Sequence, residues 1–275
     1  MSLKLMYITN NTDVALIAQK YGVDRIWVDL EVLGKEERQK YMNTVKSKHT
    51  VEDIKKIAPL LTTSEMLVRV NPWHEGSPQE INDVIDAGAD IIMLPMWETV
   101  EEVTNFVAAV GGRCKTILLL ETKEAAECVD EILKIQGIDE IHIGLNDLHL
   151  SYKLCFMFEL LSNGMIEMLC KKIQAAGIPY GFGGVARLGT GELPAEKIIL
   201  EHYRIGSTRA ILSRSFCNTE EITDIDKIEE MFRENMAAMR AYEELTSKID
   251  EKALWANHQD VINIVEQIVK EKRGL

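Results

Sequence analysis

Residues 116–122 read Thr116-Ile117-Leu118-Leu119-Leu120-Glu121-Thr122, an apolar run that ends on a carboxylate. Residues 91–94, Ile-Ile-Met-Leu, form a similar run. Short runs that are apolar throughout, rather than at every second position, are typical of parallel strands buried on both faces. Comparable runs recur along the chain and predict eight strands: Leu3–Thr9, Arg25–Glu31, Met66–Asn71, Asp90–Met96, Thr116–Thr122, Glu140–Asn146, Pro179–Gly184 and Thr208–Ser213.

Amphipathic stretches separate these runs, and each predicts a helix: 13–21, 50–61, 77–87, 99–110, 122–135, 155–176 and 194–205. Neighbouring parallel strands need a crossover connection, so eight strands with intervening helices predict an α/β fold, a (β/α)8 TIM barrel. A chain of 275 residues is the size of one such domain, which we expect to span 1–275.

Residues 225–275 predict extra C-terminal helices, over 225–248 and 258–272. The first of them carries apolar residues at helical spacing, among them Phe232, Met236 and Met239. Such a stripe indicates either a helix that covers the barrel or a surface for oligomer contacts.

The composition narrows the class of protein. There is no apolar run of about 18 residues and no signal-peptide pattern at the start, so we expect no membrane contact. The five cysteines form no Cys-x-x-Cys pair, which fits reduced thiols and a cytoplasmic protein. A net charge of −13 argues against nucleic-acid binding. It does not exclude an anionic substrate, because a metal ion and a few arginines can reverse the potential within a cleft.

Charged residues at the ends of predicted strands indicate the site, because the active site of a TIM barrel lies where its strands end. They are Asp29, Glu31, Arg69, Glu121 and Asp147. Two carboxylates on neighbouring strands, Glu121 and Asp147, suit Mg²⁺ or Mn²⁺, although helix capping or an ion pair with Arg69 would also explain them. Arg69 suits a substrate carboxylate or enolate oxygen, or a partner among the acids.

Four ordered fragments resemble the HpcH/HpaI aldolase and citrate lyase β-subunit family: Val68-Arg69-Val70-Asn71, residues 85–96 (Ile-Asp-Ala-Gly-Ala-Asp-Ile-Ile-Met-Leu-Pro-Met), Leu120-Glu121-Thr122, and residues 137–148, which contain Ile143-Gly144-Leu145-Asn146-Asp147-Leu148. The resemblance covers residues 25–216. It implies a TIM barrel with a divalent metal held by Glu121 and Asp147, and a pyruvate-type 2-oxo acid contacted by Arg69. It also implies a homo-oligomer, from dimer to hexamer, which favours oligomer contacts for residues 225–275.

The end of the second strand departs from the family pattern. The aldolases read Asp-Gly-Glu-His there and the citrate lyase branch Asp-Leu-Glu-Asp, whereas this chain reads Asp29-Leu30-Glu31-Val32. Valine cannot transfer a proton, so another residue must supply a base. We predict that His49, or a water bound to the metal, handles the proton, with His149 and His74 as further candidates. A surface role is the plain explanation for His49 and His149. Glu31 is predicted to take part in catalysis and Asp29 in substrate binding.

Two further segments predict binding of the far end of the substrate. Lys35 and Arg38 lie in the long loop after the second strand, where solvated charges are the alternative. The glycine-rich segment after the seventh strand contains Arg187, Gly189 and Gly191. Together with residues 213–215 at the end of the eighth strand, this segment predicts an anion site, or simply a tight turn.

These observations predict a metal-dependent carbon–carbon lyase of the aldolase type, which forms or cleaves a 4-hydroxy-2-oxo acid through a pyruvate enolate. A lyase acting on an acyl-CoA thioester and an oxaloacetate decarboxylase are alternatives within the family. A barrel that binds a metabolite without catalysis is a third alternative, because Val32 stands where a reactive group is expected.

Overall fold

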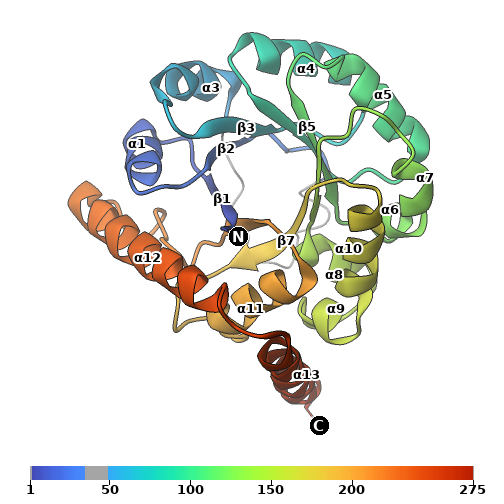
Figure 1. The fold of residues 1–275 in the computed structure, drawn as a ribbon. Helices are drawn as coiled ribbons and strands as arrows, with labels where there is room; N and C mark the ends of the chain where they lie inside the picture. Colours follow the sequence, from blue (N-terminus) through green and yellow to red (C-terminus); the bar gives the residue numbers. More distant parts are fainter. Residues whose placement is uncertain (1, 35–48, 275) are drawn as a thin grey trace.

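The computed structural model describes residues 2–34 and 49–274. Its strands form a closed parallel barrel in which each strand pairs with the next along the chain and the last pairs with the first, so the predicted TIM barrel is confirmed (Figure 1). The strands are β1 (Lys4–Ile8), β2 (Arg25–Asp29), β3 (Glu65–Arg69), β4 (Ile91–Leu94), β5 (Lys115–Leu120), β6 (Glu140–Ile143), β7 (Tyr180–Val185) and β8 (Arg209–Leu212). Each lies within or overlaps a predicted strand.

The helices surround the barrel (Figure 1). They are α1 (Thr12–Lys20), α3 (Val51–Ile57), α4 (Ser77–Asp86), α5 (Val100–Val110), α6 (Lys123–Glu127), α7 (Val129–Ile132), α8 (Leu145–Ser151), α9 (Glu159–Ser162), α10 (Met165–Ala175), α11 (Ala195–Ile205), α12 (Ile225–Thr246) and α13 (Glu251–Arg273), with a short 3₁₀ turn at Ala58–Leu60. No described helix is long and apolar enough to cross a membrane.

Several predicted boundaries were wrong. The helix predicted over 122–135 is two helices, α6 and α7, and the helix predicted over 258–272 begins at Glu251. The strand predicted over Glu140–Asn146 ends at Ile143, and Leu145 already begins α8. The single helix predicted over 155–176 is two helices, separated at Gly164, whose φ of +81° is a conformation that favours glycine.

Alternate residues of the strands face the inside of the barrel. An apolar layer fills its middle and consists of Met6, Trp27, Leu67, Ile91, Met93, Ile117 and Leu119. A second, larger core lies between the strands and the surrounding helices. Because the strands are buried on both faces, their sequences are apolar throughout, as in residues 116–122.

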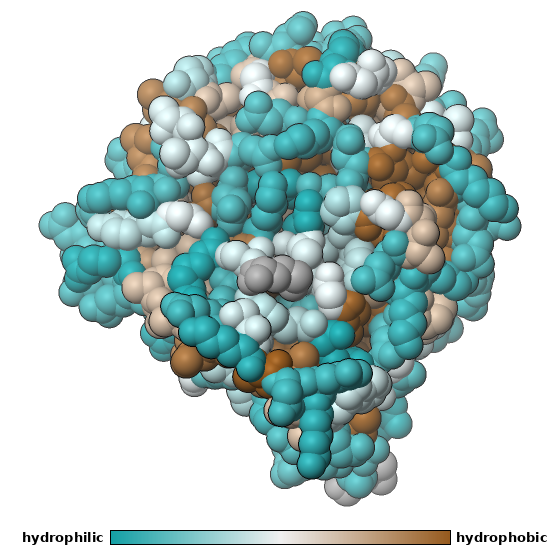
Figure 2. Space-filling view, viewed as in Figure 1, coloured by the Kyte–Doolittle hydropathy of each residue, from teal (hydrophilic) through white to brown (hydrophobic). Residues whose placement is uncertain are grey.

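A charged layer closes the end of the barrel at which the strands begin. Arg25 is fully buried and donates two hydrogen bonds to Glu140, of 2.7 and 2.6 Å, and one of 3.0 Å to Glu65. Arg209 also donates to Glu140, and Lys115 pairs with Glu65. Figure 2 shows the face on which the N-terminal end of the chain lies, with hydrophilic residues around its centre.

The C-terminal extension completes the barrel wall. α12 packs against α1 and α11, and its residues Phe232, Met236 and Met239 are buried, so this stripe covers the barrel (Figure 1). α13 packs against α11 and α9 of the same chain. Asn257 and His258 of α13 both bond to Glu201. The oligomer contacts expected of residues 225–275 stay a prediction.

We expect Glu140→Gln to lower the free energy of unfolding at pH 7 by about 3 kcal/mol, because it removes the shared partner of two buried guanidinium groups. Burial raises the pKa of Glu140, but the hydrogen bonds from Arg25 and Arg209 outweigh it and lower the pKa to about 2. The stability that Glu140 contributes is therefore complete above its unfolded pKa, near 4.5, and is lost as the pH falls toward 2.

Urea unfolding at pH 7 and pH 3 measures this effect. Glu52→Gln is the matched control, because Glu52 forms an exposed ion pair with Lys55 within α3. Equal losses for the two variants would contradict a structural role for the charged layer.

Candidate active site

A buried ion group lies at the opposite end of the barrel, around Arg69 at the end of β3. Parallel pairing sets Asp29 of β2 beside Arg69, and the guanidinium donates to both Asp29 oxygens at 2.8 and 2.9 Å. It also lies 3.1 Å from Glu31 and over the ring of Trp27. Burial lowers the pKa of Arg69, but the carboxylates of Asp29 and Glu31 outweigh it and raise the pKa, so the guanidinium stays charged.

Glu121 follows the last residue of β5 and is only 3% exposed. One of its carboxylate oxygens, Oε1, accepts a hydrogen bond of 3.1 Å from the backbone N–H of Met96. Burial and the nearby carboxylate of Asp147 raise the pKa of Glu121 well above its usual value, while Arg69 opposes this shift. The charged form of Glu121 is therefore unfavourable without an additional positive charge.

Asp147 lies in the first turn of α8, a half-buried position reached through the sharp change from strand to helix at Gly144. A Cβ atom at position 144 would lie 2.8 Å from Oε2 of Glu121, so the glycine leaves room for that carboxylate. Short β6 and the early start of α8 thus direct Asp147 toward Glu121, as the electrostatic coupling of the two acids indicates.

The carboxylates of this site are suitable ligands for a hard divalent cation. The carboxylates of Asp29, Glu31 and Glu121 lie near the guanidinium of Arg69, and Asp147 lies near Glu121. Carboxylate oxygens are the ligands that Mg²⁺ and Mn²⁺ favour. Within residues 2–34 and 49–274 no group of three or more His, Cys, Asp or Glu side chains is arranged around a common point for a metal. Water or substrate oxygens would therefore complete the coordination of an ion at Glu121 and Asp147.

Of the three candidate histidines, only His49 lies at the site. Its Nδ1 accepts a hydrogen bond of 3.0 Å from the backbone N–H of Asp29. His149 is buried and its Nδ1 donates to the carbonyl of Leu145 in its own helix. His74 bonds to Glu80 and to the N–H of Gly76, so it stabilises the loop after β3.

The role of His49 as a base stays a prediction, and the hydrogen bond from Asp29 favours a different role for its ring. A neutral imidazole that accepts at Nδ1 carries its proton on Nε2. Its second nitrogen is then a donor rather than a proton acceptor. Val32, at the position of the family's reactive residue, is 57% exposed.

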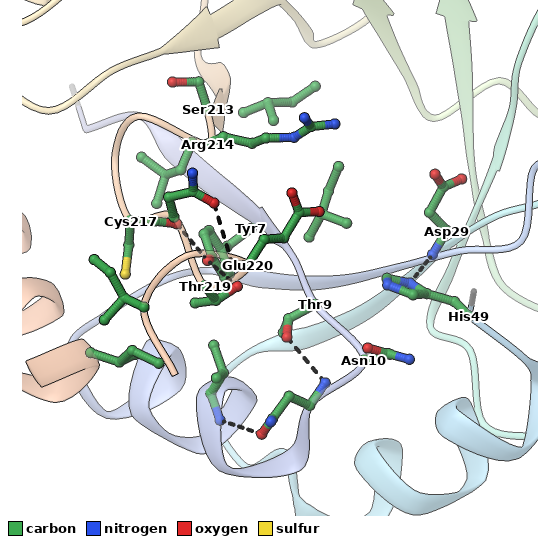
Figure 3. A pocket seen from close by; sticks show the side chains of 18 of the residues that line it. Tyr7, Thr9, Asn10, Asp29, His49, Ser213, Arg214, Cys217, Thr219 and Glu220 are labelled. Carbon is green, nitrogen blue, oxygen red and sulfur yellow. Dashed lines mark hydrogen bonds between the residues drawn. The ribbon is translucent and has the colours of Figure 1, made fainter. Parts of the chain in front are cut away.

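A cavity of about 760 Å³ opens beside these groups (Figure 3). Asp29, His49, Arg69, Asn146 and Asp147 form one end of its lining. The other end comes from the segments after β1 and β8 and includes Thr9, Asn10, Ser213, Arg214, Asn218, Thr219 and Glu220. The sequence prediction missed most of these residues because it considered charged strand ends, whereas Thr9 and Asn10 are uncharged polar residues that follow β1.

The residues after β7 that were predicted to bind an anion do not line this cavity. Arg187, Gly189 and Gly191 are exposed and are absent from the lining of this cavity. The N–H of Gly189 already donates to the carboxylate of Glu196 at 2.7 Å, and Gly191 has a φ of +102°, which fits the alternative of a tight turn. Lys35 and Arg38 lie outside the described residues.

Comparisons with known proteins agree with this arrangement. The family model described as HpcH/HpaI aldolase/citrate lyase matches residues 4–156. A 2-keto-3-deoxy-L-rhamnonate aldolase of Escherichia coli is 28% identical over 144 residues, 41% of this chain. The matched region spans 54% of that relative, about half the length of the curated proteins it resembles.

Solved structures show the same fold. The crystal structure of an HpcH/HpaI aldolase from Desulfitobacterium hafniense has a TM-score of 0.63 at 16% identity, with 83% of this chain and 93% of that chain covered. The crystal structure of the citrate synthase SbnG has a TM-score of 0.59 at 17% identity and covers 87% of this chain and 94% of its own. At these identities the likeness concerns the fold alone.

We expect Glu121→Gln to raise the urea midpoint of unfolding at pH 7 in the presence of a chelator. The amide still accepts the Met96 N–H and no longer places a charge beside Asp147. The gain should be on the order of 1 kcal/mol. Glu98→Gln, at an exposed position, is the control and should change little. A lower midpoint for Glu121→Gln would show that the carboxylate is already neutralised within the protein.

Proposed function

Because this chain belongs to the HpcH/HpaI aldolase/citrate lyase family, we propose that it is a divalent-metal-dependent aldolase that forms or cleaves a 4-hydroxy-2-oxo acid. The observation that carries the proposal is the buried carboxylate of Glu121, whose pKa is raised by burial and by Asp147, at the same end of the barrel as the charged Arg69. A cavity lined by Arg69 and Asp147 leaves room for a substrate.

Glu121 and Asp147 would hold Mg²⁺ or Mn²⁺. When bound there, the ion supplies Lewis-acid polarisation of the substrate's 2-oxo group. The need for this positive charge explains why Glu121 is buried at a position where a carboxylate is otherwise costly.

Arg69 binds and orients the substrate through its carboxylate and 2-oxo oxygens. Cleavage breaks the bond between the third and fourth carbons, and the electron pair of that bond becomes the enolate of pyruvate. The fixed guanidinium stabilises the negative charge on the enolate oxygen without reorganising, because Asp29 and Glu31 hold it in place. Asp29 and Glu31 are therefore positioning residues for Arg69 in this proposal.

His49 donates a hydrogen bond from Nε2 to the oxygen at the fourth carbon, which changes from hydroxyl to carbonyl. It stabilises negative charge on this oxygen, and the hydroxyl proton leaves to water in the cavity. Water then returns a proton to the third carbon of the enolate, which gives pyruvate. This replaces the role of base expected from the sequence, for the reason that Nδ1 accepts from Asp29.

We expect the protein to catalyse exchange of the methyl protons of pyruvate for deuterium in D₂O when Mn²⁺ or Mg²⁺ is present, as followed by proton NMR. The exchange reports enolate formation and needs no knowledge of the aldehyde. Arg69→Met should slow it about 100-fold, because the fixed charge at the enolate oxygen is lost. In Glu121→Gln, addition of Mn²⁺ or Mg²⁺ should no longer increase the rate of exchange.

Arg187→Gln is the control for Arg69→Met, because Arg187 lies outside the cavity lining. Absence of exchange, together with metal-dependent cleavage of an acyl-CoA thioester or decarboxylation of oxaloacetate, would favour one of the alternatives in the family. Metal-dependent binding of oxalate, measured by calorimetry, with no turnover of any 2-oxo acid would favour a non-catalytic barrel.

A second prediction separates the two roles of His49. As a hydrogen-bond donor it is partly replaceable, so we expect His49→Gln to keep aldol activity within about tenfold and His49→Leu to lose about 100-fold. Steady-state kinetics with pyruvate and an aldehyde measures both variants. Equal and large losses for glutamine and leucine would instead restore His49 as a base.

A further inference from the structure

The cavity is larger than a three-carbon acid needs. Its volume of about 760 Å³ lies in the range of sites that enclose a ligand of many atoms. The groups proposed for pyruvate occupy only the end at Asp29, Arg69 and Asp147. The opposite end is formed by the segments after β1 and β8, and its lining therefore meets whatever is attached to the fourth carbon.

Arg214 supplies a positive charge at that far end, where Glu220 supplies a negative one. Among the arginines of the described chain, only Arg187 and Arg214 have no hydrogen bond or ion pair from the side chain to another described residue, and of these two only Arg214 lines the cavity. Figure 3 shows its side chain extending from the segment after β8 toward the side on which Asp29 and His49 lie. A guanidinium in this position is ready to bind an anion through paired hydrogen bonds.

Neutral polar groups surround Arg214. Hydroxyls of Thr9, Ser213 and Thr219 and amides of Asn10 and Asn218 line the same end of the cavity. Several of them bond within their own loops, as Ser213 does to Ser215, but hydroxyl and amide groups retain further donors and acceptors. Such a lining suits a ligand that carries hydroxyl groups.

The charges of the cavity determine where an anionic end would lie. In the proposed reaction the carboxylate of pyruvate occupies the end near Arg69 and repels a second anion there. Glu220 is also at the far end, within the same segment as Arg214, but forms no ion pair with it or with any other described residue. Its carboxylate is suited to accept hydrogen bonds from hydroxyls next to the anionic group that Arg214 binds.

We propose that the segment after β8 selects a hydroxylated acceptor aldehyde with an anionic end, and that Arg214 binds this carboxylate or phosphate. The proposal rests on the aldolase function proposed above. It assigns the anion site to Arg214, and not to Arg187, Gly189 and Gly191, where Glu196 already occupies the N–H of Gly189.

Matched pairs of aldehydes test the selection, with pyruvate and Mn²⁺ held constant. One pair is glyceraldehyde 3-phosphate and glyceraldehyde, and the other is succinic semialdehyde and butanal. We expect the anionic member of at least one pair to have the higher kcat/KM. Arg214→Gln should raise the KM of that member about 10- to 100-fold and leave its neutral twin and pyruvate nearly unchanged. The pair that responds distinguishes phosphate from carboxylate.

Arg187→Gln is the matched control and should behave as the unaltered protein, because both residues are exposed arginines in neighbouring loops. Arg214→Lys should recover part of the loss, since it keeps the charge without the planar fork. A preference for the neutral aldehydes, or an equal effect of Arg214→Gln on both members of each pair, would overturn the proposal.

A binding measurement separates this proposal from the aldolase function. Calorimetry compares gluconate, 6-phosphogluconate and the neutral glucitol without any turnover. We expect an anionic polyol to bind the unaltered protein and Arg187→Gln at least tenfold more tightly than Arg214→Gln, and glucitol to bind all three equally weakly. If no aldehyde is turned over but this pattern holds, the aldolase function fails and the anion site stands. If the anionic polyols bind Arg214→Gln as well as the unaltered protein, the anion site fails.

Discussion

The ion group of Arg69 with Asp29 and Glu31 is the constraint on which the site depends. Closure of the barrel places these residues on neighbouring strand ends, where bidentate hydrogen bonds fix the guanidinium. At the same end of the barrel, burial and the carboxylate of Asp147 raise the pKa of Glu121. An ion pair explains the position of Arg69, but it does not explain why Glu121 is buried beside another acid. A divalent cation bound by Glu121 and Asp147, as proposed above, would favour the charged form of Glu121.

The two ends of the barrel differ in how their buried glutamates are surrounded, and so in the direction of the pKa shifts of these glutamates. Where the strands begin, Arg25, Arg209 and Lys115 face Glu65 and Glu140, so every buried charge has a partner and the pKa of Glu140 is lowered to about 2. Where the strands end, burial and the carboxylate of Asp147 raise the pKa of Glu121. An apolar layer of side chains such as Trp27 and Leu67 separates the two ends. The opposite pKa shifts of two buried glutamates follow from their surroundings and identify which end is suited to bind a ligand.

Much of the site was predictable because charges at strand ends are visible in the sequence. Asp29, Glu31, Arg69, Glu121 and Asp147 all lie at one end of the barrel, as the alternation of apolar strands and helices predicts. The lining of the far end was not predicted, since Thr9, Asn10 and Asn218 resemble ordinary loop residues. Only the closed barrel, which places β8 beside β1, shows that their segments face one cavity.

The sequence by itself determined the number and order of the strands, the family, and the acids and arginine at the strand ends, because these depend on local pattern and on the period of a buried strand. Only the tertiary structure decided the partners of those residues. In the folded chain, Nδ1 of His49 accepts a hydrogen bond from the N–H of Asp29, and Glu196 accepts one from the N–H of Gly189. Helix α12 packs over the barrel, and Arg214 lines the cavity. These outcomes depend on distances between segments far apart in the chain, and no local pattern of residues encodes such distances.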